Sequence, residues 1–382
     1  MVSAVLFITF FVLLVLNVPI SICLGLSSTA AILYSGTSLT IVATNIYSGI
    51  SKFLLLAIPF FVLSGNIMAK AGISTRLIRF VNTCVGHRKG GIANVCIIVA
   101  CFFGAISGSG PATVAALGAV LIPAMVERGG FSAPFATALM ATASSIAIVI
   151  PPSIAFVVYA SITGVSIGDM FMAGIVPGIL MGLALIVVVM LEVHKNHVVP
   201  SNVQKASAKE RLDAFKDAFW GFLMPVIILG GIYGGIFTPT EAAAVSVVYG
   251  LFVGMVIYKE VKLKDLWDIL IDSAKTTGGI MLIVACASLF SFVCTRFGIS
   301  AAASQLLAKV AGNQFTFLLI CNVIFLIAGC FIDANSAMYI FIPIMLPVCK
   351  QLGYNVIAFG IMATVNLAIG QVTPPVGVNL FV

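Results

Sequence analysis

Long apolar runs, separated by short polar or glycine- and proline-rich interruptions, make up most of this 382-residue chain. A membrane-spanning helix needs about 20 mostly apolar residues, whereas the strands of a membrane barrel alternate apolar and polar positions over about 10 residues. The runs here are continuous and amount to roughly a dozen full or partial crossings of a lipid bilayer. The pattern therefore predicts an all-α polytopic membrane protein.

The apolar segments of the first half fall at 3–17, 20–35, 53–69, 92–107, 112–126, 133–150, 154–165 and 170–193. Two interruptions lie inside apolar stretches, at Ser107-Gly108-Ser109-Gly110-Pro111 and at Ile150-Pro151-Pro152-Ser153. Glycine and proline do not continue a helix readily, and broken backbone survives at membrane depth only where it is buried in protein or lines a cavity. We therefore expect a helical hairpin at 92–126 and a broken helix at 133–165.

The second half repeats this plan at a near-constant shift, from 220 positions (Pro19 to Pro239) to 226 positions (Gly72 to Gly298). Two further markers agree: Pro123 recurs as Pro347 and Pro151-Pro152 as Pro374-Pro375. Self-similarity at a fixed period is the signature of a repeated unit. The repeat divides the chain into a first repeat at 1–193, a linker at 194–217 and a second repeat at 218–382.

By this correspondence, the second repeat contains a hairpin at 315–349, with its tip at Asp333-Ala334-Asn335-Ser336, and a broken helix from 355. The first repeat continues through the span 170–193 after its Pro-Pro break, while only a few residues follow Pro375. We therefore expect one more span beyond residue 382.

Composition and charge support a membrane protein and suggest how the two repeats are oriented. The chain is 61% hydrophobic and 8% charged, against about 25% charged residues in soluble domains, and its mean hydropathy is +1.22. The net charge of +7 resides in loops, so it does not indicate nucleic-acid binding. Segment 70–91 has five Lys or Arg and its counterpart 296–314 has two, while 36–52 has one and its counterpart 259–275 has four.

Positive charge marks cytoplasmic loops. Because the segment richer in Lys and Arg differs between the two repeats, we expect the repeats to have opposite topology in the membrane. We expect 70–91, 194–217 and the loop 259–275 on the cytoplasmic side. Hairpin 92–126 then opens to the cytoplasm and hairpin 315–349 to the outside, both re-entrant.

Four half-helix ends would meet near the middle of the membrane in this arrangement. Free carbonyls at half-helix C-termini suit Na⁺, and free N–H groups at N-termini suit a carboxylate. The candidate residues are Ser107, Gly108, Ser109, Gly110 and Pro111 facing Ser144, Ser145, Pro151, Pro152 and Ser153, and Asp333, Asn335 and Ser336 facing Gly370, Thr373, Pro374 and Pro375.

Plainer interpretations of the same residues stay open. The prolines and glycines are compatible with helix kinks packed against neighbours. Asp333 is the one acid embedded in an apolar run, which makes it a functional candidate, but it could also cap a helix as a structural residue. The serines could likewise serve close helix packing.

Several kinds of enzyme chemistry are disfavoured. All three histidines (His87, His194 and His197) fall in expected loops, which argues against intramembrane haem, a membrane zinc protease or a Ser–His pair. No GxxxxGK[ST] motif is present, and the nine cysteines are scattered without a CxxC motif. We therefore expect a transporter, neither an enzyme nor an ATPase.

Segments over the whole chain resemble the large membrane subunit of tripartite ATP-independent periplasmic (TRAP) transporters. They are LLLAIPFFVLSGNIM (54–68), SGSGPATVAALG (107–118), PPSIAFVVYA (151–160), MFMAGIVPG (170–178), PVIILGGIYGGIFTPTEAAAV (225–245) and TPPVGVNLF (373–381). The resemblance implies a Na⁺-driven secondary importer of organic acids, C4-dicarboxylates or sialic acid, that works by an elevator motion in the bacterial inner membrane. It is somewhat greater for the sialic-acid branch.

The resemblance also implies partners and ligands. The partners are a small four-helix membrane subunit and a periplasmic substrate-binding protein. One Na⁺ site would use Ser107, Gly108, Ser109, Ser145 and Pro151, the other Asp333, Gly370 and Thr373; the substrate would lie near Ser109, Ser153, Asp333 and Asn335. Two alternatives remain: a stand-alone Na⁺- or H⁺-coupled carboxylate transporter, and a membrane-embedded enzyme or redox subunit.

Overall fold

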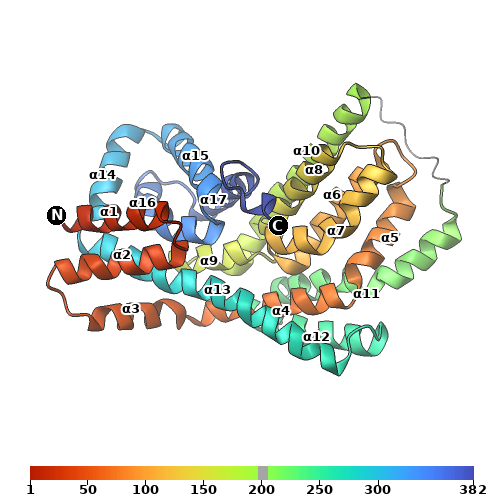
Figure 1. The fold of residues 1–382 in the computed structure, drawn as a ribbon, viewed down its shortest axis with the longest axis horizontal. Helices are drawn as coiled ribbons and strands as arrows, with labels where there is room; N and C mark the ends of the chain where they lie inside the picture. Colours follow the sequence, from red (N-terminus) through yellow and green to blue (C-terminus); the bar gives the residue numbers. More distant parts are fainter. Residues whose placement is uncertain (197–204) are drawn as a thin grey trace.

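The computed structural model describes residues 1–196 and 205–382, which form 17 α-helices and no strand (Figure 1). The helices are α1 (Val2–Val15), α2 (Ile20–Tyr34), α3 (Thr40–Ile50), α4 (Ala57–Lys70), α5 (Ile73–Val85), α6 (Gly91–Ser107), α7 (Gly110–Glu127), α8 (Ala133–Ser145), α9 (Ile154–Thr163), α10 (Ile167–Lys195), α11 (Ala208–Tyr233), α12 (Pro239–Phe252), α13 (Leu263–Arg296), α14 (Ile299–Ala311), α15 (Gln314–Phe331), α16 (Ala334–Gln351) and α17 (Val356–Gly370). The predicted all-α class is confirmed.

Seven helical segments of the described chain are long and apolar enough to cross a membrane. They are Phe53–Lys70, Gly110–Glu127, Ile167–Lys195, Ala208–Tyr233, Pro239–Ile257, Leu263–Arg296 and Gln314–Phe331. The protein is therefore a multi-pass membrane protein. The remaining apolar helices, among them α6, α8, α9 and α17, are shorter.

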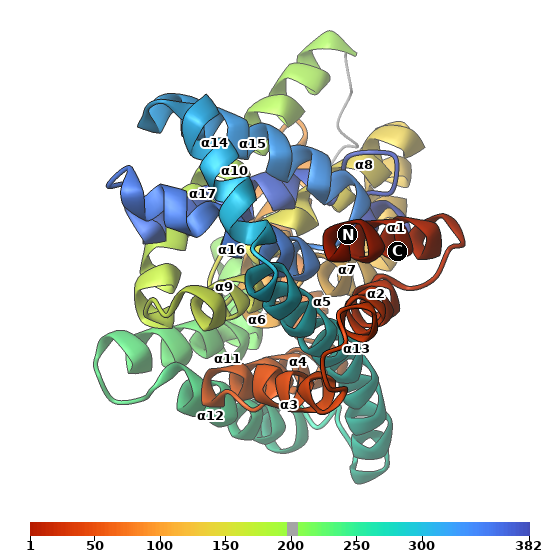
Figure 2. The ribbon, with the colours of Figure 1, turned by 90° about the vertical axis from the view of Figure 1, so that its left-hand side faces the viewer.

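Helices α2, α3, α4, α12 and α13 pack closely, and small residues at the crossings allow the close approach. A methyl group on Gly25 of α2 would lie 3.0 Å from Sγ of Cys286 in α13, and one on Gly49 of α3 would lie 2.6 Å from Ser288. Asn66 of α4 donates a hydrogen bond to Ser273 of α13 at 2.8 Å. Helix α13 extends across much of the molecule in Figures 1 and 2. We call the group formed by α2, α3, α4, α12 and α13 the scaffold.

The two predicted hairpins pack against the scaffold, with α6 against α4 and α16 against α13. Hairpin α6–α7 packs with α8 at one end of the molecule, and hairpin α15–α16 packs with α17 at the other (Figure 1). Their bounds agree with the predicted 92–126 and 315–349 to within two residues. The tips are shorter than expected: only Gly108 and Ser109 separate α6 from α7, because Pro111 lies in the first turn of α7, where its missing N–H is not needed.

Several expected loops contain helix. The polar stretch 36–52 contains α3, and most of the expected loop 259–275 belongs to the first turns of α13. The expected linker 194–217 is shorter, because α11 begins at Ala208, where Ser207 and Glu210 form a reciprocal capping box. His194 lies in the last turn of α10, not in a loop. His197 and the rest of 197–204 lie outside the described residues.

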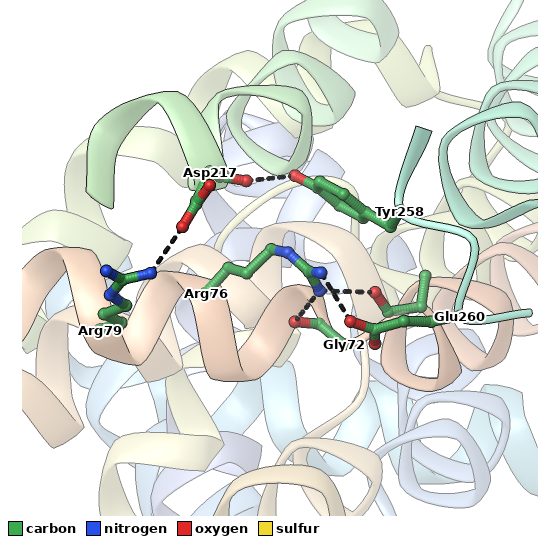
Figure 3. A network of polar contacts seen from close by, with 7 residues as sticks. Gly72, Arg76, Arg79, Asp217, Tyr258 and Glu260 are labelled. Atoms are coloured by element: carbon green, nitrogen blue, oxygen red, sulfur yellow. Dashed lines mark hydrogen bonds and ion pairs between the residues drawn. The ribbon is translucent and has the colours of Figure 1, made fainter. Parts of the chain in front are cut away.

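The basic arm 70–91 contains α5, which is held to the scaffold and α11 by the ion-pair network of Figure 3. Arg76 pairs with Glu260 at 2.6 Å, and its guanidinium lies 3.9 Å from the ring centre of Tyr258. Arg79 pairs with Asp217 at 2.6 Å, and Tyr258 donates to the carbonyl of the same Asp217. Gly72 (φ +67°) brings the backbone against Glu260.

Candidate functional site

The first hairpin tip is built from glycine and hydroxyl groups. Gly108 ends α6 in the left-handed conformation (φ +60°), and Ser109 precedes α7 with extended backbone. The hydroxyls of Ser107 and Thr113 share a hydrogen bond of 2.9 Å, and Thr113 also donates to the carbonyl of Ser109 at 2.8 Å. The Ser109 hydroxyl makes no hydrogen bond within the described part of the chain, so it is available to a ligand.

The first helix break lies directly against this tip. A methyl group on Gly108 would lie 2.8 Å from the carbonyl oxygen of Pro152, and Ile154 donates its N–H to the Gly108 carbonyl at 3.5 Å. Deeper in the hairpin, Gly104 packs on the backbone of Ala147. The structure thus brings the predicted residues Ser107, Gly108 and Ser109 next to the Pro151-Pro152 break, whose peptide bond is cis.

The other predicted residues of the first half are buried and hydrogen-bonded locally. The Ser145 hydroxyl donates to the Thr142 carbonyl at 2.7 Å, and that of Ser144 to the Met140 carbonyl at 2.8 Å. Ser153 is fully buried; it donates to the Ile148 carbonyl at 2.5 Å and caps α9. In this conformation Ser153 faces its own break.

The second tip is closed by a charged side chain. Asp333 caps α16: its Oδ2 accepts from the backbone N–H groups of Asn335 and Ser336 at 3.0 and 3.2 Å, and its Oδ1 accepts from the Ser336 hydroxyl. The Oδ1 atom of Asn335 is buried and has no hydrogen-bond partner among the residues that the structure describes. Asp333 therefore performs the capping role.

The second break lies against the second hairpin in a closely similar way. The Cα atoms of Gly329 and Gly370 approach so closely that a methyl on either would meet the other within 2.9 Å. Val376 and Gly377 donate their N–H groups to the Cys330 carbonyl at 3.0 and 3.3 Å. The predicted residue Thr373 donates to the Ile369 carbonyl at 2.7 Å, and the Pro374-Pro375 bond is cis.

A cavity of about 400 Å³ separates the first tip from the scaffold. Ser107, Ser109 and Ala112 face it from the hairpin, and Asn66 of α4 and Thr276 of α13 from the scaffold. Ligand pockets of roughly 300–1,000 Å³ hold small organic molecules. Of the predicted substrate residues, Ser109 lines this cavity, while Ser153, Asp333 and Asn335 do not.

Sequence reasoning missed four residues of this region. Asn66 is a polar residue in the long apolar span 53–69, a signal that the sequence contains, whereas Thr276 directly follows the polar segment 259–275 and does not stand out from it. Gln371 and Asn379 flank the second break and lie against Gly110 of the first hairpin. That contact between the two halves leaves no pattern in the sequence.

Residues 7–382 match the family described as tripartite ATP-independent periplasmic transporter, DctM component. The C4-dicarboxylate TRAP transporter large permease protein DctM of Pseudomonas aeruginosa is 43% identical over 94% of this chain and 84% of its own length.

Two further relatives differ in the substrates for which they are named. The isethionate TRAP transporter permease protein DctMQ of Oleidesulfovibrio alaskensis is 42% identical over 99% of this chain and 59% of its own length. The sialic acid TRAP transporter large permease protein SiaM of Vibrio cholerae is 36% identical over 92% of this chain and 82% of its own length. From the family match and these identities, the chain belongs to the DctM family, the large permease component of the TRAP transporters.

Proposed function

We propose that this permease imports a small organic acid by sodium symport in the inner (cytoplasmic) membrane of a bacterium. The hairpins α6–α7 and α15–α16 with their breaks form the moving part, and the scaffold stays fixed, as in an elevator. The observation that carries the proposal is the cavity between the first tip and the scaffold. A cavity at such a boundary can change its access when one side slides past the other.

The hairpin–break contacts support a pair of ion sites. In each half a hairpin carbonyl accepts N–H groups from the residues after the cis Pro-Pro bond: Gly108 from Ile154, and Cys330 from Val376 and Gly377. Na⁺ is a hard cation that prefers such carbonyl and hydroxyl oxygens. We place one ion at Ser107, Gly108, Ser109, Ser145 and Pro151, and the other at Asp333, Gly370 and Thr373. The matching contacts also support a repeated structural unit in the two halves.

The chemistry of the cavity supports an organic anion as substrate. The N-terminus of α7 begins at Gly110, and free N–H groups there favour a carboxylate. The Ser109 hydroxyl supplies a further donor. The relatives are named for C4-dicarboxylate, isethionate and sialic acid, all acids. We propose a substrate from this range, delivered by a periplasmic binding protein to a complex with a small membrane subunit.

The proposal is tested by uptake into liposomes that contain the permease and its small subunit, with the binding protein and a radiolabelled acid outside. An inward Na⁺ gradient should drive accumulation, and replacing Na⁺ by choline should abolish it. Equal uptake in choline would show that transport is not coupled to sodium. Equal uptake without the binding protein would favour the alternative, a stand-alone carboxylate transporter.

The substitution Ser109→Ala tests the cavity itself. We expect the KM for the acid to rise about 10-fold, because a hydrogen bond to a charged group is lost, while the melting temperature stays unchanged, since the hydroxyl has no partner within the described protein. Ser144→Ala is the matched control, because Ser144 is buried, bonds within its own helix and does not line the cavity. An unchanged KM in Ser109→Ala would place the substrate elsewhere.

A further inference from the structure

Two amide side chains from the second break converge on the first hairpin tip. A methyl group built on Gly110 would lie 2.8 Å from Oε1 of Gln371 and 2.9 Å from Oδ1 of Asn379. Gln371 is 5% exposed and Asn379 is 2% exposed, and neither of these oxygens has a hydrogen-bond partner within the described residues. Leaving a buried acceptor unpaired is unfavourable, so the arrangement calls for a physical reason.

The orientation of Asn379 is fixed by its other contacts. Its Nδ2 donates to the carbonyl oxygen of Ala141 in α8 at 3.2 Å, and its backbone N–H donates to the carbonyl of Gln371 at 3.0 Å. Both amide atoms lie beside the tip, since a methyl group on Gly110 would lie 2.9 Å from Oδ1 and 3.0 Å from Nδ2, and with the nitrogen bonded to Ala141 the Oδ1 atom is the unpaired one. The segment after the second break is thereby tied to both α8 and hairpin α6–α7, all from the first half.

The electrostatics of α7 explain why the two unpaired amide oxygens are stable beside Gly110. Gly110 is the first residue of α7, an 18-residue helix, and its N-terminus carries partial positive charge from unpaired N–H groups. Amide oxygens at that end are favoured, and a metal cation between them is disfavoured. The cavity residue Ala112 lies on the opposite side of the same helical turn, so the amide pair lies behind the tip, away from the cavity.

We propose that Gln371 and Asn379 are positioning residues that dock the second break onto the first hairpin tip and so couple the two sodium sites. Gln371 directly follows Gly370 and precedes Thr373, while Gly110 directly follows Ser109. An ion that orders Gly370 and Thr373 therefore orders the segment that abuts the first tip, and the reverse also holds. The coupling rests on the proposed function, whereas the docking contact stands on its own.

The coupling is tested by the sodium dependence of uptake in the reconstituted complex. With two coupled sites the Hill coefficient for Na⁺ approaches about 2 in the wild type. We expect Gln371→Met and Asn379→Leu, which keep the volume and remove the amide, to lower it towards 1 and to raise the Na⁺ concentration for half-maximal uptake. Gln305→Met is the control, because Gln305 is exposed on α14; its Hill coefficient should match the wild type.

The docking contact is tested separately by a double-substitution cycle read as melting temperature. Gly110→Ala should lower it, since the added methyl meets both amides, and Asn379→Ala should relieve the part of that effect that comes from Asn379, so that the double variant is more stable than the sum of the singles predicts. Additive shifts would overturn the docking. A wild-type Hill coefficient in Gln371→Met and Asn379→Leu would overturn the coupling of the two sodium sites. Uptake by the wild type without Na⁺ would overturn the proposed function. The docking contact would then still be decided by the melting temperatures of the double-substitution cycle.

Discussion

The two hairpins of this permease close their tips by different chemistry. The first turns at Gly108, whose positive φ and contact with Pro152 leave no room for a side chain. The second turns through Ile332 and Asp333 with extended backbone, and the Asp333 carboxylate caps the next helix. One tip thus exposes backbone and hydroxyl oxygens, and the other carries a negative charge. An ion at the first tip must be held by neutral oxygens, while one at the second can be held by a carboxylate.

The two breaks are held by different contacts. Pro151 and Pro152 are buried, and α10 approaches this break through Gly174, which packs on the Val149 carbonyl, and Gly178, which packs on Ile150. Within the described chain, the second break is held by the bonds of Val376 and Gly377 to the Cys330 carbonyl and by Asn379, which donates to the Ala141 carbonyl of α8. The second break is therefore linked to both halves of the chain.

The largest effect is expected from Gly108→Ala. An alanine in the left-handed conformation costs about 1–2 kcal/mol, and here its methyl would also lie 2.8 Å from a backbone oxygen that cannot rotate away. We expect the free energy of unfolding to fall by more than about 2 kcal/mol and uptake to be lost, measured by thermal unfolding in detergent and by liposome uptake.

Gly164→Ala is the matched control for this substitution. Gly164 also has a positive φ (+79°), but apart from its chain neighbours no atom of the described residues lies within 4 Å of the added methyl. It should show only the conformational cost, about 1 kcal/mol, and retain uptake. If both variants behave alike, the first tip is not locked to its break and the contrast between the tips is wrong.

The second tip is probed by comparing Asp333→Asn with Asp333→Ala. Asparagine caps helices as well as aspartate, while alanine costs about 1 kcal/mol, so only Asp333→Ala should lose stability. If Asp333 also binds sodium, Asp333→Asn should keep its melting temperature and raise the Na⁺ concentration for half-maximal uptake about 10-fold, since a charged ligand is lost.

The control for the cap is Asn355→Ala. Asn355 caps α17 with two bonds of the same kind, to Ile357 at 2.9 Å and Ala358 at 3.0 Å. It should lose stability like Asp333→Ala without a change in sodium dependence. Wild-type sodium dependence in Asp333→Asn would make Asp333 a structural cap and remove the difference in charge between the two proposed ion sites.

The sequence predicted the elements that rest on local chemistry. The apolar runs, the glycine at 108 and the paired prolines each act within a few residues, so the hairpins and breaks were located to within two or three positions. The tip at 107–111 was drawn too long, because a proline in the first turn of a helix gives the same signal as a break. The expected loop 259–275 proved to be helical, since its charges lie on the solvent-exposed first turns of α13.

Contacts between the halves could not be predicted in this way. Gln371 and Asn379 are single polar residues near a proline motif, and nothing in their spacing indicates that Gly110, some 260 positions earlier, is their neighbour. The cavity could not be predicted for the same reason, because its lining combines Asn66 and Thr276 from separate helices. Aligning the two repeats shows which residues correspond to each other, but it gives no information on which residues of one half contact the other half.

The smallest expected effect comes from a comparison of α5 with α14, the corresponding helix of the second repeat. Helix α5 is tied down by ion pairs (Figure 3), whereas the corresponding α14 makes one hydrogen bond to the second hairpin, from Ser304 to the Ile344 carbonyl at 2.6 Å. Arg79 is 60% exposed and makes a single pair, so Arg79→Met should change stability by less than about 0.5 kcal/mol.

Arg76→Met should have the larger effect of the two, about 1–2 kcal/mol, because the side chain is 23% exposed, lies over Tyr258 and bonds the Ala71 and Gly72 carbonyls as well as Glu260. Unfolding in 0.1 and 1 M NaCl separates the causes: salt screens an exposed pair, so the difference between Arg76→Met and the wild type should shrink at high salt but not vanish. Equal stability of both variants would mean that the contacts of Arg76 add nothing to how α5 is held.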